Sequence, residues 1–564
     1  MKETIKETVN KALNDLSLGQ ADFQIEHPTD TSNGDYSTNV SLIVSKAAGK
    51  NPKEVATEIV ENIRKHTPKE IDRIEIAGPG FINFYLSKEY FLSKTKDILK
   101  DNNFGENDSL KNKKIIVEFT DPNPFKEFHI GHLMSNTVGE SIARLAEANG
   151  AYVKRANWQG DMGRNVAIAV WGMKQGDLPD EDKTIQDKVN FLGKAYTLGS
   201  QKFEEDEGVK AEILEVNKKL FAKSDDDLNE LYSLGRKWSL DYFETIYERL
   251  GTDFDYYFFE SEEAERGKET VEDNISNGIF EESEGAIIYD GEKKGLHKRV
   301  FINSQGLPTY EAKELGLAQA KKERFNYDSS VVITGNEQDS YFKVILSAMN
   351  DVFPELASKT KHMSHGMMKL SSGKMSSRKG NVVTGEGIID DIAELVEERI
   401  KDRDIENKEE VKEAVAVGAI KYSILKQSIG KDIIFDFEKS VSFEGDSGPY
   451  LQYTYTRARS ILEKAKAEGV KVGEASDDWD VSELEKLLYR LPEVIKYAYS
   501  NYAPQAVVSF ATEVAGAYNS FYAQSQIVDT KDPNSPYKVA LTEATMNVIK
   551  KSLDVLGIKV VERM

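Results

Sequence analysis

Two histidines, His129 and His132, flank Ile130-Gly131 in a segment that could hold an anion. The residues before them, 113–120, are rich in β-branched side chains and predict a strand. DPNP at 121–124 ends that strand, because proline lacks the N–H that a strand ladder needs. A helix pattern begins at the histidines, and free amides and the helix dipole favour negative charge at a helix N-terminus. The pattern indicates a site for the phosphates of a nucleotide.

A second segment, 361–384, is a strand-like piece followed by a serine- and glycine-rich loop that carries Lys369, Lys374, Arg378 and Lys379. Attack by a carboxylate on the α-phosphate of ATP builds negative charge on the transferred group and on the departing pyrophosphate. Such a reaction needs positioned donors and cations rather than a covalent nucleophile. A basic loop alone is more often an exposed linker. Its occurrence with the histidine motif favours a functional interpretation.

Together the two segments predict one site for ATP. We expect His129 and His132 to donate to phosphate oxygens from one side and Gly131 to leave room for adenine. We expect Lys374, helped by Lys126, Arg378 or Lys379, to close over the leaving group from the other side. Mg²⁺ would bridge the phosphates and be held mainly by them.

The elements around the histidines predict a β-α-β unit. Val138, Ile142 and Leu145 lie on one stripe of the helix, Gly150 suits its C-terminal cap, and 151–158 reads as a second strand. We therefore expect a Rossmann-like, doubly wound catalytic domain, which binds ligands at the carboxyl ends of its strands.

The rest of the chain predicts a multidomain α/β protein. Residues 1–105 read as a separate α/β domain with a hairpin around Gly78-Pro79-Gly80, and 113–385 as the catalytic domain. An acidic helical insertion is expected at about 176–296, after which the sheet would resume at 299–303. Residues 386–564 read as an all-α domain.

Composition limits the classes of protein. The 564 residues include no cysteine, which excludes disulfides, thiolate catalysis and cysteine-ligated zinc. A net charge of -22 argues against a protein that coats nucleic acid indiscriminately, although a local basic track would still suffice for a specific partner. With no long apolar run and no signal-like start, we expect a cytoplasmic protein without membrane contact. We also expect a monomer.

HIGH at 129–132 and KMSSR at 374–378 together resemble the signature pair of class I aminoacyl-tRNA synthetases, and their flanks are similar to those of the arginyl enzymes. The resemblance covers essentially the whole chain. The segments that carry it are NGDYSTN at 33–39, AGPGFIN at 77–83, DPNP at 121–124, GDMG at 160–163, LPTYEAKE at 307–314, SFEGDSGPYLQY at 442–453 and ERM at 562–564.

This resemblance implies an arginine-tRNA ligase that uses ATP with Mg²⁺ and no zinc. Such an enzyme activates L-arginine to arginyl-adenylate and transfers it to the 3′ end of tRNA(Arg), and it characteristically needs tRNA bound for activation. The implied catalytic residues are His129, His132, Lys374 and Lys126; the ATP-binding residues are His129, Gly131, His132, Met375, Ser376 and Arg378; the arginine-binding residues are Asn123, Glu260, Tyr310, Glu314 and Gln338.

Two positions depart from the family pattern. The family commonly has aspartate where this chain has Glu314, so the pocket must accommodate a longer acid. The signature loop has Ser377 where a second lysine is usual, and Lys126 lies where many arginyl enzymes carry a substitute cation.

By the same resemblance, the helical domain binds the anticodon and residues 1–105 bind the outer corner of the tRNA. Tyr450, Tyr453, Arg457 and Arg459 form an aromatic and basic strip that could stack on unpaired nucleotides, although tyrosines packed in a helical core would give the same pattern. Two other functions fit the motifs less completely. One is a catalytically inactive tRNA-binding scaffold, and the other is a small-acid adenylyltransferase of the same superfamily.

Replacement of Lys374 tests the role of the signature loop. We predict that Lys374→Ala lowers the aminoacylation rate by about 10²- to 10³-fold, because a cation that stabilises the departing pyrophosphate is lost. The tRNA affinity should change little. Steady-state aminoacylation and a filter-binding titration measure the two quantities, and equal rates in variant and parent would remove the loop from the mechanism.

Overall fold

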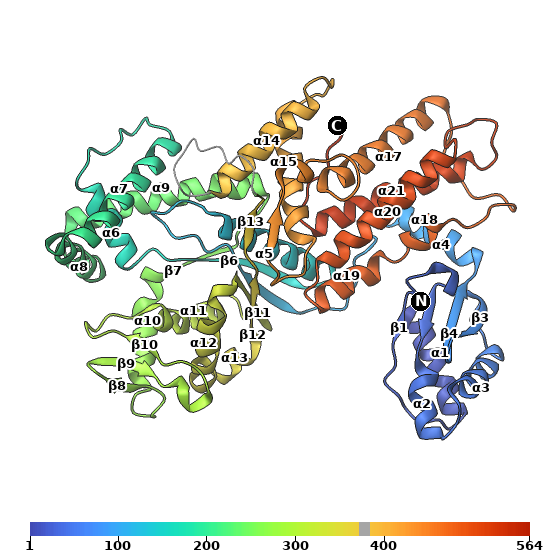
Figure 1. Cartoon of the computed structure of the whole chain (residues 1–564), viewed down its shortest axis with the longest axis horizontal. Coiled ribbons are helices and arrows are strands. Elements are labelled where there is room, and N and C mark those ends of the chain that lie inside the picture. The colour runs from blue at the N-terminus through green and yellow to red at the C-terminus, as the bar shows by residue number, and fades with distance from the viewer. Residues whose placement is uncertain (372–383) are drawn as a thin grey trace. The chain divides into compact units, whose positions relative to one another are not determined.

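A computed structural model describes residues 1–371 and 384–564 of the chain (Figure 1). The chain forms two compact units. Unit 1 comprises Met1–Phe104, Arg457–Leu491 and Glu513–Val548; unit 2 comprises Gly105–Thr456, Pro492–Thr512 and Ile549–Met564.

Unit 1 contains a four-stranded antiparallel sheet in the order β1-β2-β4-β3. The predicted hairpin is confirmed, since β3 and β4 pair antiparallel around Gly78-Pro79-Gly80. The elements of this part are α1 (Lys2–Asp15), β1 (Ile25–Glu26), η1 (Thr31–Asn33), β2 (Tyr36–Thr38), α2 (Val40–Ala48), α3 (Pro52–Arg64), β3 (Ile71–Ala77), β4 (Phe81–Leu86), α4 (Lys88–Lys100) and α18 (Glu483–Leu488).

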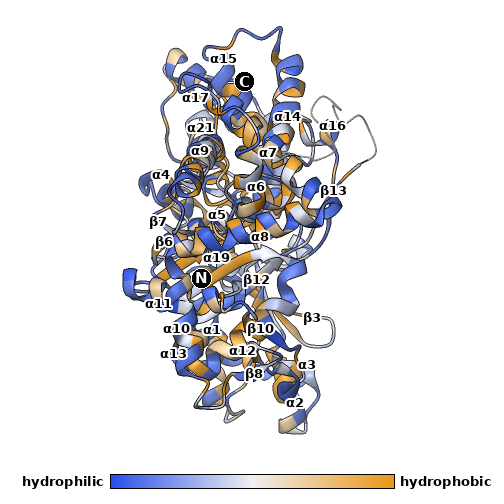
Figure 2. Cartoon of the chain, turned by 90° about the vertical axis from the view of Figure 1, so that its left-hand side faces the viewer, coloured by the Kyte–Doolittle hydropathy of each residue, from blue (hydrophilic) through white to orange (hydrophobic). Residues whose placement is uncertain are grey.

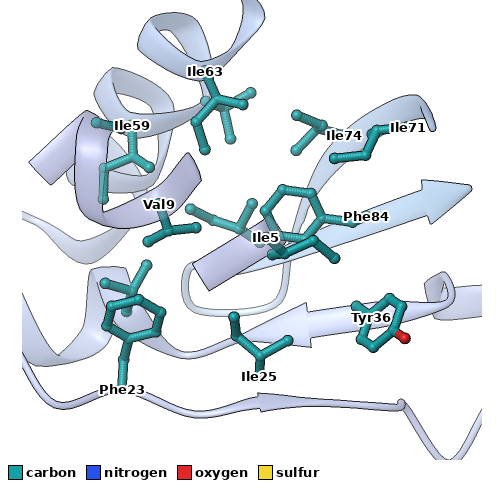
Figure 3. Close-up of a cluster of buried hydrophobic side chains, with 14 of the residues drawn as sticks. Ile5, Val9, Phe23, Ile25, Tyr36, Ile59, Ile63, Ile71, Ile74 and Phe84 are labelled. Carbon is teal, nitrogen blue, oxygen red and sulfur yellow. The ribbon is translucent and has the colours of Figure 1, made fainter. Parts of the chain in front are cut away.

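The helices of unit 1 bury one apolar face each. Ile5 and Val9 of α1 meet Ile59 and Ile63 of α3 over Phe84 of the sheet (Figure 3). The i, i+4 spacing of both pairs puts the two side chains of each helix on one stripe, which is how this sequence specifies the packing.

Unit 2 is organised around a five-stranded sheet in which every strand is parallel to its neighbours. The order is β12-β11-β5-β6-β7, from β5 (Lys114–Glu118), β6 (Tyr152–Gln159), β7 (Tyr256–Phe259), β11 (Ser329–Gly335) and β12 (Thr360–His365). The first strand therefore lies in the middle, and the chain winds outward on both sides of it. This is the doubly wound arrangement that was predicted, with its switch point between β5 and β11.

Helix α5 (Ile130–Ala148) begins at that switch point. Ser135 Oγ accepts from Thr120 N at 3.0 Å and donates to Ile333 O at 3.0 Å, so one hydroxyl links the ends of β5 and β11. Gly139 allows the close approach, because a Cβ there would lie 2.2 Å from Cγ of Phe119. The expected apolar stripe is buried, and so is most of the rest of the helix surface.

The sheet does not resume at 299–303, so that prediction is wrong. β10 (Arg299–Ile302) pairs antiparallel with β9 (Ala286–Tyr289) in a separate three-stranded sheet with β8 (Glu281–Ser283). The third strand of the parallel sheet is instead β7, within the acidic stretch expected as an insertion. The sequence of this strand, YYFF, is too short and too uniformly aromatic to show the alternation of apolar and polar residues that predicts a strand.

The remaining elements of unit 2 are mostly helices. Those of the catalytic region are α6 (Arg164–Met173), α7 (Ile185–Glu205), α8 (Glu207–Ala222), α9 (Asp226–Leu250), α10 (Glu260–Asp273), η2 (Gly291–Lys294), α11 (Tyr310–Arg324), η3 (Asn336–Gln338), α12 (Asp339–Val352), α13 (Pro354–Lys359) and β13 (Met368–Leu370). They are followed by α14 (Gly385–Ile400), α15 (Lys408–Leu425), β14 (Ile433–Phe435), α16 (Phe437–Ser440) and α19 (Leu491–Ser500).

Three further helices contribute several residues to each unit: α17 (Gly448–Glu468), α20 (Gln505–Gln524) and α21 (Ser535–Val555). The helices carry both hydrophilic and hydrophobic segments (Figure 2). Within residues 1–371 and 384–564, each helix is too short or too polar to cross a lipid bilayer.

A buried ion pair joins the sheet of unit 2 to α11. Nζ of Lys321 lies 2.8 Å from Oε2 of Glu118, the last residue of β5, and both side chains are almost fully buried. We predict that Lys321→Met lowers the free energy of unfolding by about 3–5 kcal/mol, because it leaves a buried carboxylate without its cation. Urea unfolding measures the change. Lys154→Met, which breaks the more exposed pair with Asp255, should cost less than about 1 kcal/mol, and equal losses would contradict the argument.

Candidate functional site

A cavity of about 390 Å³ lies at the switch point of the parallel sheet in unit 2. Its lining comes from the loop after β5, the start of α5, the end of β11 and the chain between β12 and β13. The residues are Thr120, Asp121, Asn123, His129, Ile130, Gly131, His132, Met134, Ser135, Ile333, Thr334, Gly335, Glu337, Gln338, His365, Gly366, Met367 and Met368. Five residues that the sequence singled out therefore lie together: Asn123, His129, Gly131, His132 and Gln338.

The loop after β5 has an unusual backbone. Thr120, Asp121 and Phe125 have φ values of 78°, 46° and 68°, a region that side-chain-bearing residues rarely adopt. Hydrogen bonds to distant segments hold this loop: Trp158 N donates to Asp121 Oδ1 at 2.8 Å, and Phe125 N donates to Ser239 Oγ at 2.9 Å. Strained backbone that the surroundings hold in place is typical of functional sites.

His129 and His132 stack on each other, with ring centroids 3.6 Å apart and planes inclined by 21°. Nδ1 of His129 accepts from Gly131 N at 3.1 Å, and Nδ1 of His132 accepts from His129 N at 3.2 Å. A Cβ at Gly131 would lie only 3.0 Å from Cε1 of His129, so the absence of a side chain at Gly131 leaves space for the His129 ring in this position. Because both Nδ1 atoms accept, the ring proton of each neutral imidazole is on Nε2.

Both imidazoles are held in the neutral form. Burial lowers the pKa of His132 well below its ordinary value, and the neighbouring His129 and Lys126 lower it further. Partial burial and Lys126 lower the pKa of His129 as well. Each neutral ring carries its proton on Nε2 and can donate one hydrogen bond from it. Two such donors at a helix N-terminus suit the recognition of phosphate oxygens.

The signature loop residues Lys374, Met375, Ser376 and Arg378 lie outside the described residues. Described residues before and after 372–383 contact the cavity or one of its lining residues. Met367 and Met368 line it, and Thr384 forms a backbone bridge with His129. Gly385 N also donates to Phe128 O at 2.7 Å.

Beside the cavity lies a group of buried charged side chains. Glu260, the first residue of α10, forms an ion pair with Lys313 of α11, with Oε2 and Nζ 2.6 Å apart. Burial raises the pKa of Glu260 to about 7, with Lys313 opposing that rise. The group borders the cavity at Gly160, because a Cβ on Gly160 would lie 2.3 Å from Asn123 Oδ1 and 3.3 Å from Glu260 Oε1.

Glu314 follows Lys313 on α11 and is partly buried. No hydrogen bond or ion pair holds its carboxylate among the residues that the structure describes. Burial raises its pKa to about 8, and the charge of Glu118 adds to the rise. An acid that lacks a protein cation in a buried acidic surrounding is suited to bind a cationic ligand.

The remaining predicted residues lie around these groups. Tyr310 begins α11, is half exposed, and has its ring centroid 5.0 Å from Lys313 Nζ. Lys126 follows the strained loop, and its Nζ lies 5.1 Å from the ring centroid of Tyr196.

The four predicted tRNA-binding residues lie on α17, apart from the cavity lining. Tyr450 and Tyr453, in unit 2, are partly buried. In unit 1, Arg457 donates to Asn519 and lies 5.1 Å from the ring centroid of Tyr522, and Arg459 pairs with Glu463 at 3.3 Å.

Sequence reasoning missed Lys313, Glu337 and His365. His365 is almost fully buried, and its Nδ1 forms a hydrogen bond of 2.7 Å with the carbonyl oxygen of Gly366. The histidine is visible in KHMSHGMM at 361–368, directly before the signature loop, and that position was the available signal. Lys313 lies within LPTYEAKE at 307–314, but its burial was not expected, because a lysine on a charged helix is usually exposed.

Among the described residues, no group of three or more histidine, aspartate or glutamate side chains is arranged to hold a metal ion.

Three protein families match successive parts of the chain. Residues 2–86 match the arginyl tRNA synthetase N terminal domain, residues 94–437 match the class I (R) tRNA synthetase catalytic domain, and residues 451–564 match the DALR anticodon binding domain.

Full-length relatives agree with these matches. The chain is 32% identical to an arginine–tRNA ligase of Limosilactobacillus reuteri, covering 100% of both chains. It is 31% identical to that of Halothermothrix orenii, covering 100% of this chain and 99% of the relative. Among solved structures, arginyl-tRNA synthetase of Thermus thermophilus superposes with a TM-score of 0.82 at 22% identity over 100% of both chains. Methionyl-tRNA synthetase of Mycobacterium tuberculosis, in complex with methionyl-adenylate, gives 0.51 at 13% identity over 79% of this chain and 91% of that one.

Proposed function

The chain belongs to the arginyl-tRNA synthetases of class I, and from this premise we propose how its residues hold the substrates. It is an arginine-tRNA ligase. The reaction consumes ATP and arginine, forms arginyl-adenylate and pyrophosphate, and then gives arginyl-tRNA and AMP. The observation that carries the proposed site is the cavity at the start of α5, between the carboxyl ends of β5 and β11.

ATP would bind in this cavity with its phosphates at the histidine pair. The stacked imidazoles of His129 and His132 each offer a neutral Nε2–H, and Gly131 keeps the helix N-terminus open. Lys126 adds a positive charge close enough to lower the pKa of both histidines. The bridge between Thr384 and His129 supports a role for Lys374, Met375, Ser376 and Arg378 at the same phosphates.

Arginine would place its guanidinium at the acidic group beside the cavity. A guanidinium is a planar, permanently charged fork, and carboxylates are its natural partners. Glu314, which lacks a protein cation among the described residues, and Glu260, close to Gly160, supply two such partners. Tyr310 would border the side chain, while Asn123 and Gln338, both in the cavity lining, would face the amino and carboxylate groups.

In the first step a carboxylate oxygen of arginine attacks the α-phosphorus of ATP, and the bond to the β-phosphate oxygen breaks. Pyrophosphate takes the electron pair. The Nε2–H donors of His129 and His132 would stabilise the charge that develops on the phosphate oxygens. In the second step a hydroxyl of the terminal ribose attacks the arginyl carbonyl, and AMP leaves.

Magnesium would come with ATP. The phosphate oxygens of ATP would supply most of its ligands. Its charge would offset that of the phosphates during the first step.

The tRNA would contact residues of both compact units. In unit 1 the lining of a cavity of about 510 Å³ includes four amide side chains and the exposed ring of Phe81. Its residues are Gln24, Glu26, His27, Pro28, Thr29, Asn33, Ser37, Asn39, Ala77, Gly78, Phe81 and Asn83. Amides pair with base edges and a ring can stack on a base, which supports RNA binding by residues 1–105. Tyr450, Tyr453, Arg457 and Arg459 remain proposed contacts of α17, in a helical domain at 386–564 that would bind the anticodon. We place the reaction in the cytoplasm, where tRNA is charged.

The two alternative functions are not supported. A small-acid adenylyltransferase would not need the N-terminal and anticodon-binding domains that match over this chain. An inactive scaffold is at odds with full-length relatives that are ligases. ATP–pyrophosphate exchange with each amino acid, with and without tRNA, tests both, since a scaffold gives no exchange and an adenylyltransferase gives exchange without RNA.

Replacement of Glu314 tests the arginine pocket. We predict that Glu314→Gln raises the KM for arginine by about 10- to 100-fold and changes the KM for ATP by less than about twofold, because only the guanidinium loses a charged partner. The parent KM for arginine should fall as pH rises from about 6.5 to 8.5, since Glu314 has a raised pKa and binds the cation in its ionised form. Glu314→Gln should weaken this pH dependence. Glu323→Gln, at the exposed end of the same helix, is the control, and parallel rises in both KM values would make Glu314 structural.

Replacement of Phe81 tests the cavity in unit 1. We predict that Phe81→Ala raises the KM for tRNA by about tenfold, because one base loses its stacking surface. The KM values for arginine and ATP should stay unchanged. Ile43→Ala, which truncates a side chain of similar exposure outside the cavity lining, should leave all three unchanged. Aminoacylation at varied tRNA concentration measures the effect, and an unchanged tRNA KM in Phe81→Ala would exclude this cavity from tRNA binding.

A further inference from the structure

Lys313, in the first turn of α11, is an unusual lysine, because its side chain is 96% buried. Its Nζ atom lies 2.6 Å from Oε2 of Glu260 and donates to Met162 O at 3.5 Å. The ammonium is also bordered by two aromatic rings, Tyr310 at 5.0 Å and Phe221 at 5.7 Å from the centroids. A buried lysine with this surrounding is fixed in position.

The ion pair uses only one oxygen of Glu260. Oε2 accepts from Lys313, while Oε1 points toward Gly160, whose added Cβ it would approach to 3.3 Å. A Cβ on Gly160 would also lie 2.3 Å from Oδ1 of Asn123, a residue of the cavity lining. Oε1 therefore faces the side of the pocket on which Asn123 meets the ligand.

Most of the neighbouring carboxylates are paired with a cationic side chain of the protein. Lys321 neutralises Glu118, Arg299 lies 3.5 Å from Glu311, and Lys313 neutralises Glu260. Glu314 alone of these four acids has no cation within ion-pair distance among the described residues. The pocket thus offers the substrate one carboxyl group without a protein cation among the described residues, at Glu314, and one oriented oxygen, at Glu260.

We propose that Lys313 is a positioning residue for arginine: by holding Oε2 of Glu260 it keeps this carboxylate in place with Oε1 turned toward the substrate guanidinium. This inference rests on the proposed arginine pocket. Lys313 does not itself touch the substrate, and its effect passes entirely through Glu260.

The electrostatic consequence follows from the groups that face Glu260. Burial and the charge of Asp161 raise the pKa of Glu260, and Lys313 is the cation that lowers it. Tyr310, Glu314 and Tyr341 also face this carboxylate, and none of them is a cation. Removal of Lys313 therefore raises the pKa of Glu260 above its present value of about 7, so that more of the carboxyl is protonated at neutral pH.

The test compares four variants of the full chain by aminoacylation: Lys313→Met, Lys313→Arg, Glu260→Gln and the control Lys421→Met. Lys421 is fully buried in the same unit and donates to Leu250 O and Gly557 O, so its loss removes a buried ammonium elsewhere. At pH 7 we expect Lys313→Met to raise the KM for arginine at least about tenfold with the KM for ATP unchanged. Lys313→Arg should restore most of the loss, and Lys421→Met should leave the KM for arginine unchanged.

A pH series separates positioning from a merely structural role. The ratio of arginine KM in Lys313→Met to that in the parent should fall between pH 7 and 9, because the higher pH ionises Glu260 in the variant. A ratio that stays constant with pH, an unchanged KM for arginine, or parallel rises for arginine and ATP would each overturn the proposal for Lys313. If Glu260→Gln itself leaves the arginine KM unchanged, the proposed arginine pocket is at fault rather than Lys313 alone.

Discussion

The placement of one helix N-terminus between two strand ends is the constraint on which the rest of unit 2 depends. Ser135 enforces it, since its hydroxyl bonds both Thr120 N and Ile333 O. A parallel sheet leaves a gap where its winding reverses, and α5 enters that gap with its amide end toward the cavity. The strained loop before α5 is the local cost of this placement.

The electrostatics of the site depend on which buried charges are paired. Burying an ion without a partner costs several kcal/mol, so Glu118 and Glu260 each have a lysine. Glu314 is the exception: it is partly buried, and none of the described residues supplies a cation to its carboxyl group. In the proposed pocket the substrate guanidinium would complete this pairing, which would couple selectivity for arginine to the charge balance of the pocket.

The histidine motif contributes by geometry more than by charge. Backbone amides occupy both Nδ1 atoms, and burial keeps both rings neutral, so His129 and His132 are fixed donors. In the proposed site the positive charge for the phosphates would come from Lys126, Mg²⁺ and the signature loop. Such a division suits a reaction in which charge moves from the α-phosphate to the leaving group, because fixed donors cost no reorganisation.

The histidine motif, the strands and helices with clear periods, and the doubly wound class could be predicted from sequence, since each depends on local spacing. The motif indicated His129, Gly131 and His132, the family resemblance indicated Asn123 and Gln338, and all five line one cavity. The three-dimensional packing was needed to show that β7 completes the sheet, that β10 belongs to another sheet, and that Lys313 is buried against Glu260. A short strand is defined by the strands with which it pairs, and a lysine is buried only when other segments pack over it. Neither property is encoded in a local sequence pattern.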